Sequence, residues 1–127
     1  MTPNDFRIRC GKLYPWHSTK IVQPWNFYCT KWIRRGDGRE LAGVTLFTRR
    51  RVYVRADTVK EMRLTCAHEL HHILLMYVRC NKGDGSLEEY IVRESEATFA
   101  AFLDGLGYWD KNPIPEEFHG FLKDEED

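Results

Sequence analysis

The most constraining feature of this chain is a pair of histidines four residues apart inside a long segment of helical periodicity. From Thr58 to about Arg79 apolar residues recur every three or four positions, and this spacing predicts a helix. Thr58 followed by Glu61 is a capping-box pattern that marks the start of that helix. On a helix, His68 and His72 share one face, so they can present two imidazole nitrogens to a single ion.

Glu69 completes the pattern H-E-x-x-H, which is typical of zinc sites. It lies about 100° further round the helix than His68, so it can reach a metal-bound water without being a ligand itself. The surrounding segment is mostly apolar, and burying these ionisable groups without partners would cost several kcal/mol. We therefore expect His68 and His72 to hold zinc and Glu69 to act as general base.

A second helix is predicted from Ser86 to Gly105 or Gly107, because Ser86 with Glu89 repeats the capping-box pattern and glycine ends many helices. One stripe of this helix is apolar apart from Glu94, and a lone carboxylate there is costly unless it is paired or bound to metal. We therefore expect Glu94 to be the third zinc ligand. The stripe consists of Leu87, Ile91, Glu94, Ala97 and Ala101.

Two alternatives to Glu94 exist. Glu96 lies about 160° away on the same helix and is the alternative third ligand. A third histidine fits the spacing poorly, since Leu75 and Val78 occupy the glycine and histidine positions of the extended three-histidine motif. The next histidine along the chain is His119, which would reach the site only if the C-terminal segment folded back.

Residues 62–72 resemble the active helix of the ImmA/IrrE family of gluzincin metallopeptidases, whose pattern reads roughly R-F-T-L-A-H-E-L-G-H. Residues 94–101 are similar to the family's E-x-E-A-N-x-F-A-A, in which we take the first Glu as the zinc ligand, here Glu94. The resemblance covers about residues 43–105. It implies a zinc-dependent metallopeptidase with one Zn²⁺ per chain that cleaves a protein or peptide substrate.

The same resemblance implies an α+β, zincin-like fold, in which a small antiparallel or mixed sheet packs on the H-E-x-x-H helix and on a second, Glu-bearing helix. There are departures from the family pattern. His71 replaces a glycine, and Thr98 stands where Asn or Asp supports a metal-binding histidine. A hydrogen-bond donor to the developing oxyanion is usually needed as well. The candidates for that role are His71, Tyr77, Tyr90 and His119.

The first half of the chain predicts strands. Residues 27–33 are rich in aromatic and β-branched side chains, and residues 44–48 and 51–55 flank a short basic turn, as in a hairpin. Residues 6–10 predict a further strand, whereas residues 12–24 show no clear period and remain unassigned. We expect substrate to add as an extra strand along residues 51–55, at an exposed sheet edge.

The length of 127 residues predicts one domain, residues 1–127, with an acidic C-terminal tail over residues 123–127. Four scattered cysteines predict free thiols, although a bridge between Cys10 and Cys29 remains an alternative. No apolar run approaches the ~18 residues of a membrane span, and the N-terminus lacks an apolar segment, so we expect a cytoplasmic protein with no membrane contact. The sequence leaves the oligomeric state open.

Charge is divided unevenly along the chain. Residues 1–63 contain fourteen Lys and Arg against five Asp and Glu, a balance of +9, and residues 64–127 contain the reverse. We expect the two halves to attract each other within one fold. The alternative is a protein that binds nucleic acid, or a protease acting on DNA-bound proteins, through the basic half. The residues that support it are Arg34, Arg35, Arg39, Arg49, Arg50, Arg51 and Arg55, with Trp16, Trp25, Tyr28 and Trp32.

A third interpretation is a zincin-like module that binds a partner without cleaving it. The intact Glu69 argues against this interpretation, because a binding module needs no general base.

Overall fold

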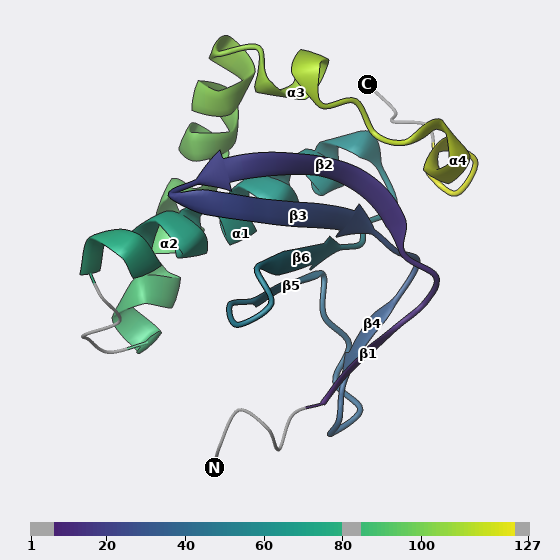
Figure 1. Cartoon of the computed structure of the whole chain (residues 1–127), viewed down its shortest axis with the longest axis horizontal. Helices are drawn as coiled ribbons and strands as arrows, with labels where there is room; N and C mark the ends of the chain where they lie inside the picture. Colours follow the sequence, from purple (N-terminus) through teal and green to yellow (C-terminus); the bar gives the residue numbers. More distant parts are fainter. Residues whose placement is uncertain (1–6, 80–84, 124–127) are drawn as a thin grey trace.

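A four-stranded sheet lies at the centre of a mixed α+β fold in the computed structural model, which describes residues 7–79 and 85–123 (Figure 1). The strands are β1 (Ile8–Cys10), β2 (Tyr14–Ile21), β3 (Gln23–Cys29), β4 (Ile33–Arg35), β5 (Gly43–Leu46) and β6 (Arg51–Val54). The helices are α1 (Val59–Arg79), α2 (Gly85–Gly105), α3 (Tyr108–Lys111) and α4 (Glu116–His119).

The central sheet has the strand order β2-β3-β6-β5. Strands β3 and β6 are parallel, while the β2–β3 and β5–β6 pairs are antiparallel, so the sheet is mixed, in agreement with the α+β class and the mixed sheet that we expected. The predicted hairpin of residues 44–48 and 51–55 is confirmed as β5 and β6. However, β6 lies between β3 and β5, so the expectation that residues 51–55 form an exposed edge is wrong. The edge strand on that side is β5.

The region that sequence periodicity left unassigned contains β2, the other edge strand. Its pairing with β3 shifts register between Pro15 and His17, so buried and exposed side chains do not alternate regularly along it. Such an irregularity hides a strand from a search for period two. The strand predicted for residues 27–33 is divided, because β3 ends at Cys29 and Ile33 begins β4. Strand β4 pairs with β1 in a separate two-stranded ribbon.

Helix α1 begins at the predicted capping box. The backbone N–H of Glu61 donates to Thr58 Oγ1 at 3.2 Å, and the hydroxyl of Thr58 donates to Glu61 Oε1 at 3.2 Å. The helix packs against one face of the sheet, and α2 packs against α1 (Figure 1). The core between α1 and the sheet contains Phe27, Cys29, Val52, Val54, Met62, Cys66, Leu70 and Ile73.

Helix α2 ends at Gly105 as predicted, and Gly107 follows with a φ of 76°, which glycine adopts without strain. Cys10, Cys29 and Cys66 are free thiols, so the alternative of a Cys10–Cys29 bridge is wrong. The tail at residues 124–127 and the loop at residues 80–84 lie outside the described residues. Within the described parts of the chain, no helix combines the length and the apolar character that crossing a membrane requires.

His17 on β2 gives the fold a pH dependence. Its ring stacks on Phe27 with 4.4 Å between ring centroids, and Thr19 Oγ1 and the Tyr108 hydroxyl lie 3.0 Å and 3.3 Å from its two nitrogens. Burial lowers the pKa of His17 from 6.5 to about 4. Because the unfolded chain then binds a proton more readily than the folded chain, stability is lost as the pH falls from 6.5 towards 4.

We predict that His17→Gln removes this dependence. Between about pH 7 and about pH 4.5, the free energy of unfolding of the wild type should fall by about 2 kcal/mol more than that of the variant. Urea unfolding of both proteins at the two pH values measures this difference. An equal fall in both proteins would contradict the assignment.

Candidate metal centre

His68 and His72 project from α1 towards α2, as the motif predicts, and their Nε2 atoms lie 3.2 Å apart. The third group at this point is Glu89 of α2. Its Oε1 lies 3.2 Å from His68 Nε2, and its Oε2 lies 3.0 Å from His72 Nε2. His68, His72 and Glu89 thus bring one donor atom each close enough together to hold a metal ion.

Two further carboxylates hold the outer nitrogens of the histidines. His68 Nδ1 lies 3.2 Å from Glu96 Oε1, and His72 Nδ1 lies 2.7 Å from Glu88 Oε1. A carboxylate only accepts hydrogen bonds, so each pair favours the tautomer in which Nδ1–H is the donor. Both Nε2 lone pairs then point at the shared position, as in metal sites whose histidines are oriented by carboxylates.

Glu69 is buried but faces a different partner. The hydroxyl of Thr45 on β5 donates to Glu69 Oε1 at 2.7 Å. A Cβ at Gly43 would lie 3.1 Å from Glu69 Oε2 and only 2.7 Å from Thr65 Cγ2, so glycine is needed where β5 approaches α1. Burial raises the pKa of Glu69, and the hydrogen bond from Thr45 opposes part of that rise. The carboxylate is therefore held beside the two histidines by the sheet and not by α2.

The prediction that Glu94 faces the core is wrong. Glu94 is exposed and is not part of the donor group that the described residues form. The alternative, Glu96, is partly buried and contacts His68 through Nδ1, on the side of the ring away from the shared position. Glu89 is the carboxylate that lies with His68 and His72, where we expected Glu94.

Four other residues that the sequence singled out do not belong to the group of His68, His72 and Glu89. Tyr90 and Thr98 are exposed on α2. The Tyr77 hydroxyl accepts a hydrogen bond from Trp25 Nε1 at 3.2 Å, which ties it to the core. His119 is exposed on α4 and lines a separate cavity with Trp16 and Trp109.

His71 points to a polar contact with Ser95. The Ser95 hydroxyl donates to the carbonyl of Ile91 at 2.8 Å and lies 3.2 Å from His71 Nδ1. Since the single hydroxyl hydrogen is used by Ile91, we infer that His71 Nδ1–H is the donor to Ser95. Burial lowers the pKa of His71. A neutral ring with its proton on Nδ1 has only an acceptor at Nε2, so it is a poor donor to an oxyanion.

The sequence also contained a pattern that places Glu89 and Glu96 on the buried side of α2, but we preferred the stripe that contains Glu94. Both belong to a stripe with the spacing three, four, three, four, which places them with the side chains that α2 buries or half-buries. The chosen stripe relied on two alanines, which carry little information because alanine occurs on any helix face. The stripe that faces α1 consists of Glu89, Val92, Glu96, Phe99 and Leu103.

Comparison of the chain with known protein families, with curated proteins and with solved structures finds no match. The family resemblance therefore rests on the motifs alone, and the candidate metal centre rests on the distances between His68, His72 and Glu89.

We predict that Glu89, and not Glu94, is required for metal binding. After dialysis against zinc, the wild type and Glu94→Ala should each retain about one ion per chain, whereas Glu89→Ala should retain nearly none, because two histidines make an incomplete site. Elemental analysis of the three proteins measures this. Loss of metal from Glu94→Ala with retention by Glu89→Ala would contradict the assignment.

A second prediction concerns the carboxylate that orients His68. Glu96→Gln removes the charge that holds Nδ1–H, and a change of this kind typically lowers metal affinity by about 10–100-fold. Glu94→Gln on the exposed side of α2 is the matched control and should bind zinc as the wild type does. Competition with a chromophoric chelator gives the three affinities. Equal affinities for Glu96→Gln and the wild type would rule out the orienting role.

Proposed function

We propose that this protein is a zinc-dependent metallopeptidase, with His68, His72 and Glu89 as ligands and Glu69 as general base. The observation that carries the proposal is the convergence of three donors on one point, with a buried carboxylate held separately beside them. The resemblance of residues 62–72 to the active helix of gluzincins supports the same conclusion.

The donor set fits zinc. Zinc binds imidazole nitrogen and carboxylate oxygen at about 2.0–2.2 Å, so two ligands of a tetrahedral ion lie roughly 3.3–3.5 Å apart. The three separations of 3.2, 3.2 and 3.0 Å are close to this value. Three protein ligands leave one position of the tetrahedron open, which is the arrangement of catalytic zinc sites.

Two imidazoles and one carboxylate also bind iron(II) in oxygenases. Hydrolysis is favoured here because Glu69 is a buried proton acceptor beside the donors, and such a base has a direct use in activating water. Elemental analysis of the purified protein distinguishes the two metals.

In the proposed reaction, zinc when bound supplies Lewis acidity and lowers the pKa of its water towards about 7. Glu69 accepts the proton of the attacking water and returns it to the leaving amine. Thr45 fixes Oε1 of Glu69 by its 2.7 Å hydrogen bond, and the absence of a side chain at Gly43 allows β5 to approach Glu69 this closely. Glu88 and Glu96 keep the two histidine rings in position.

We further propose that substrate binds along β5. This strand pairs with β6 on one side and is the last strand of the central sheet in the described part of the chain. An extended peptide could therefore pair with its other side by main-chain hydrogen bonds. Such a peptide would pass close to Glu69, because Gly43 and Thr45 of β5 contact that residue.

We predict that Glu69→Gln keeps the metal and the fold but loses peptidase activity. The amide cannot accept the proton of water, and removal of a general base typically lowers the rate by 10²–10⁴-fold, roughly. A fluorogenic peptide library identifies a cleaved sequence with the wild type, and turnover of that sequence is then measured for the variant.

Metal content and melting temperature of Glu69→Gln are the controls, and both should match the wild type. Unchanged turnover in a correctly loaded variant would refute the role of Glu69. If the zinc-loaded wild type cleaved no member of the library while binding metal normally, the peptidase proposal itself would fail.

A further inference from the structure

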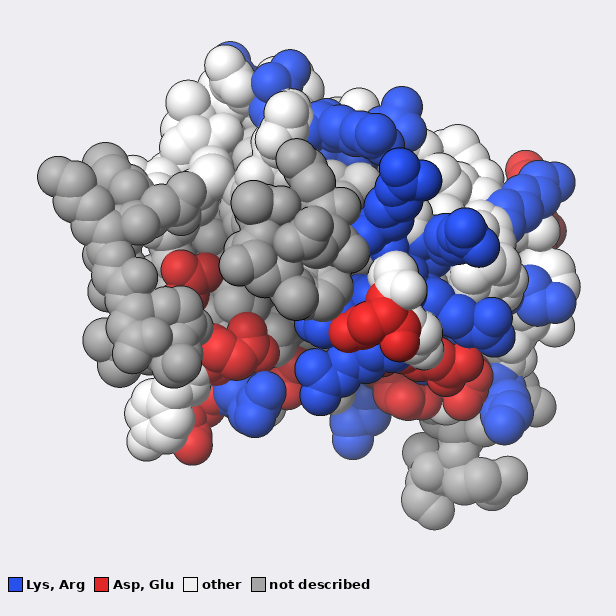
Figure 2. Space-filling view, turned by 90° about the horizontal axis from the view of Figure 1, so that it is seen from below, with Lys and Arg blue, Asp and Glu red and all other residues white. Residues whose placement is uncertain are grey.

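A group of arginines covers the β1–β4 ribbon, β6 and the turns that follow β4 and β5. We call this surface the arginine face. Figure 2 shows Lys and Arg gathered on the side of the molecule where these elements lie. Between residues 32 and 59 the chain contains arginines but no lysine. The arginine face consists of Arg9, Arg34, Arg35, Arg39, Arg49, Arg50, Arg51 and Arg55.

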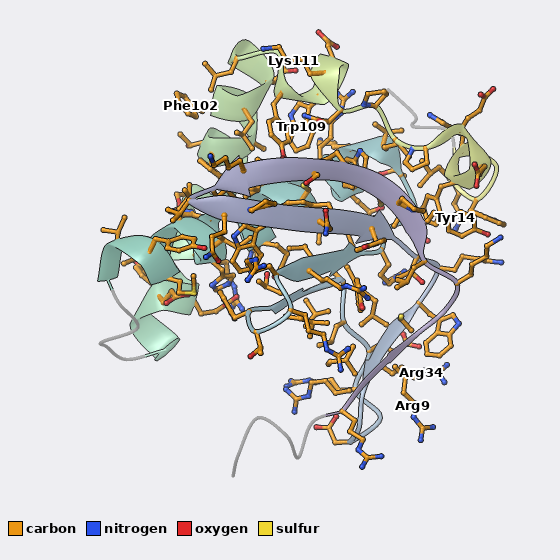
Figure 3. All side chains as sticks on the ribbon, in the orientation of Figure 1. Arg9, Tyr14, Arg34, Phe102, Trp109 and Lys111 are labelled. Carbon is orange, nitrogen blue, oxygen red and sulfur yellow. The ribbon has the colours of Figure 1, made fainter. Side chains whose placement is uncertain are left out.

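The ribbon places two of these charges directly against each other. Arg9 of β1 is the register partner of Arg34 of β4, and both side chains are exposed. They reach outward from the same side of the ribbon (Figure 3). Like charges directly opposite on neighbouring strands are destabilising. This pair therefore lowers the stability of a ribbon that has only three residue pairs, and an anionic ligand would reverse that effect.

Ion pairs within the protein neutralise the face only in part, and they are local. Arg34 lies 3.7 Å from Glu40, but both side chains are more than half exposed, so the pair contributes little. Arg55 lies 3.6 Å from Asp57 two residues away, and Arg35 pairs with Asp37. These acidic partners all belong to the basic half of the chain. The expected attraction between the two halves thus does not account for these three arginines.

The use of arginine in place of lysine on this surface favours a ligand that carries phosphate groups. Arginine offers planar, paired donors that match phosphate oxygens, and it stacks on aromatic rings, whereas lysine is a point charge. The guanidinium of Arg34 lies 5.1 Å from the ring centre of Trp32, and that of Arg51 lies 5.5 Å from the ring centre of Tyr28. These contacts hold two guanidinium planes in place before any ligand arrives.

We propose that the arginine face binds the phosphate backbone of a nucleic-acid duplex. A duplex carries about one negative charge per 1.7 Å of its axis, which suits a surface whose arginines come from several elements. The candidate metal centre is not part of this surface. Its carboxylates are negatively charged, as phosphate is, and would repel a nucleic acid; they belong to Glu69, Glu88, Glu89 and Glu96. The inference goes beyond the proposed peptidase activity and does not depend on it.

The test uses fluorescence anisotropy with a short labelled DNA duplex of mixed sequence and the purified full chain. Binding by the wild type should weaken steeply between about 50 and 200 mM salt, because phosphate contacts release counterions. Arg9→Gln/Arg34→Gln should weaken binding by roughly 10–100-fold and reduce the slope of log K against log salt by about 2. A parallel titration with an RNA duplex tells which nucleic acid binds more tightly.

The matched control is Arg63→Gln/Lys111→Gln, which removes the same charge from α1 and α3. Lys111 lies at the opposite end of the molecule from Arg9 and Arg34 (Figure 3). The control should bind DNA within about threefold of the wild type and keep its salt slope. Circular dichroism and melting temperature establish folding, and the ribbon variant should melt no lower than the wild type, since the like-charge pair is gone. Should it fail to fold, Arg9→Gln alone replaces it.

Three results would overturn the proposal. The first is the absence of salt-dependent binding by the wild type, and the second is an equal loss in both double variants, which would reflect net charge alone. The third is competition by polyglutamate as effective as that by DNA at equal charge concentration, which would indicate an acidic polypeptide partner. None of these readouts involves the metal, so they leave the metal-content and turnover experiments unaffected.

Discussion

The contact between α1 and α2 is the interaction on which the candidate site depends. Helix α1 carries two largely buried imidazoles into this contact, where an unpartnered polar group would be costly. Helix α2 resolves this by placing a carboxylate at every ring nitrogen of His68 and His72. The arrangement concentrates negative charge at one point, and such a concentration is stable when a cation shares it. A metal ion bound at this point would supply that charge, so metal binding and the packing of the two helices would support each other.

In the H-E-x-x-H motif, the roughly 100° turn between neighbouring helix residues points the proposed ligands and the proposed base in different directions. His68 and His72 face α2, whereas Glu69, about 100° further round, faces β5 and receives the hydrogen bond of Thr45. The sheet thus positions the proposed base and α2 completes the proposed ligand set. Because β5 is the last strand of the central sheet among the described residues, the element that holds Glu69 is also the strand along which we propose that an extended peptide pairs. The arginine face is built from other elements than the four carboxylates of the candidate centre, which belong to α1 and α2.

Local signals in the sequence predicted the elements well where they were strong. The capping box at Thr58, the apolar period of α1 and the turn between β5 and β6 were each sufficient, because neighbouring residues determine them. Strand β2 was missed because the register shift at Pro15 and His17 breaks its alternation. The edge was assigned to β6 because strand order depends on the parallel pairing with β3, which residues far apart in the chain create.

The sequence by itself determined that His68 and His72 share a helix face and that Glu69 lies beside them, since backbone geometry alone sets those angles. Only the tertiary structure decided which carboxylate completes the group. Glu88, Glu89, Glu94 and Glu96 all belong to α2, and the rotation of that helix against α1 selects among them. That rotation buries Val92 and Leu103 and half-buries Phe99. Residue spacing within α2 allowed two different stripes, and packing against the partner surface decided which of them is buried.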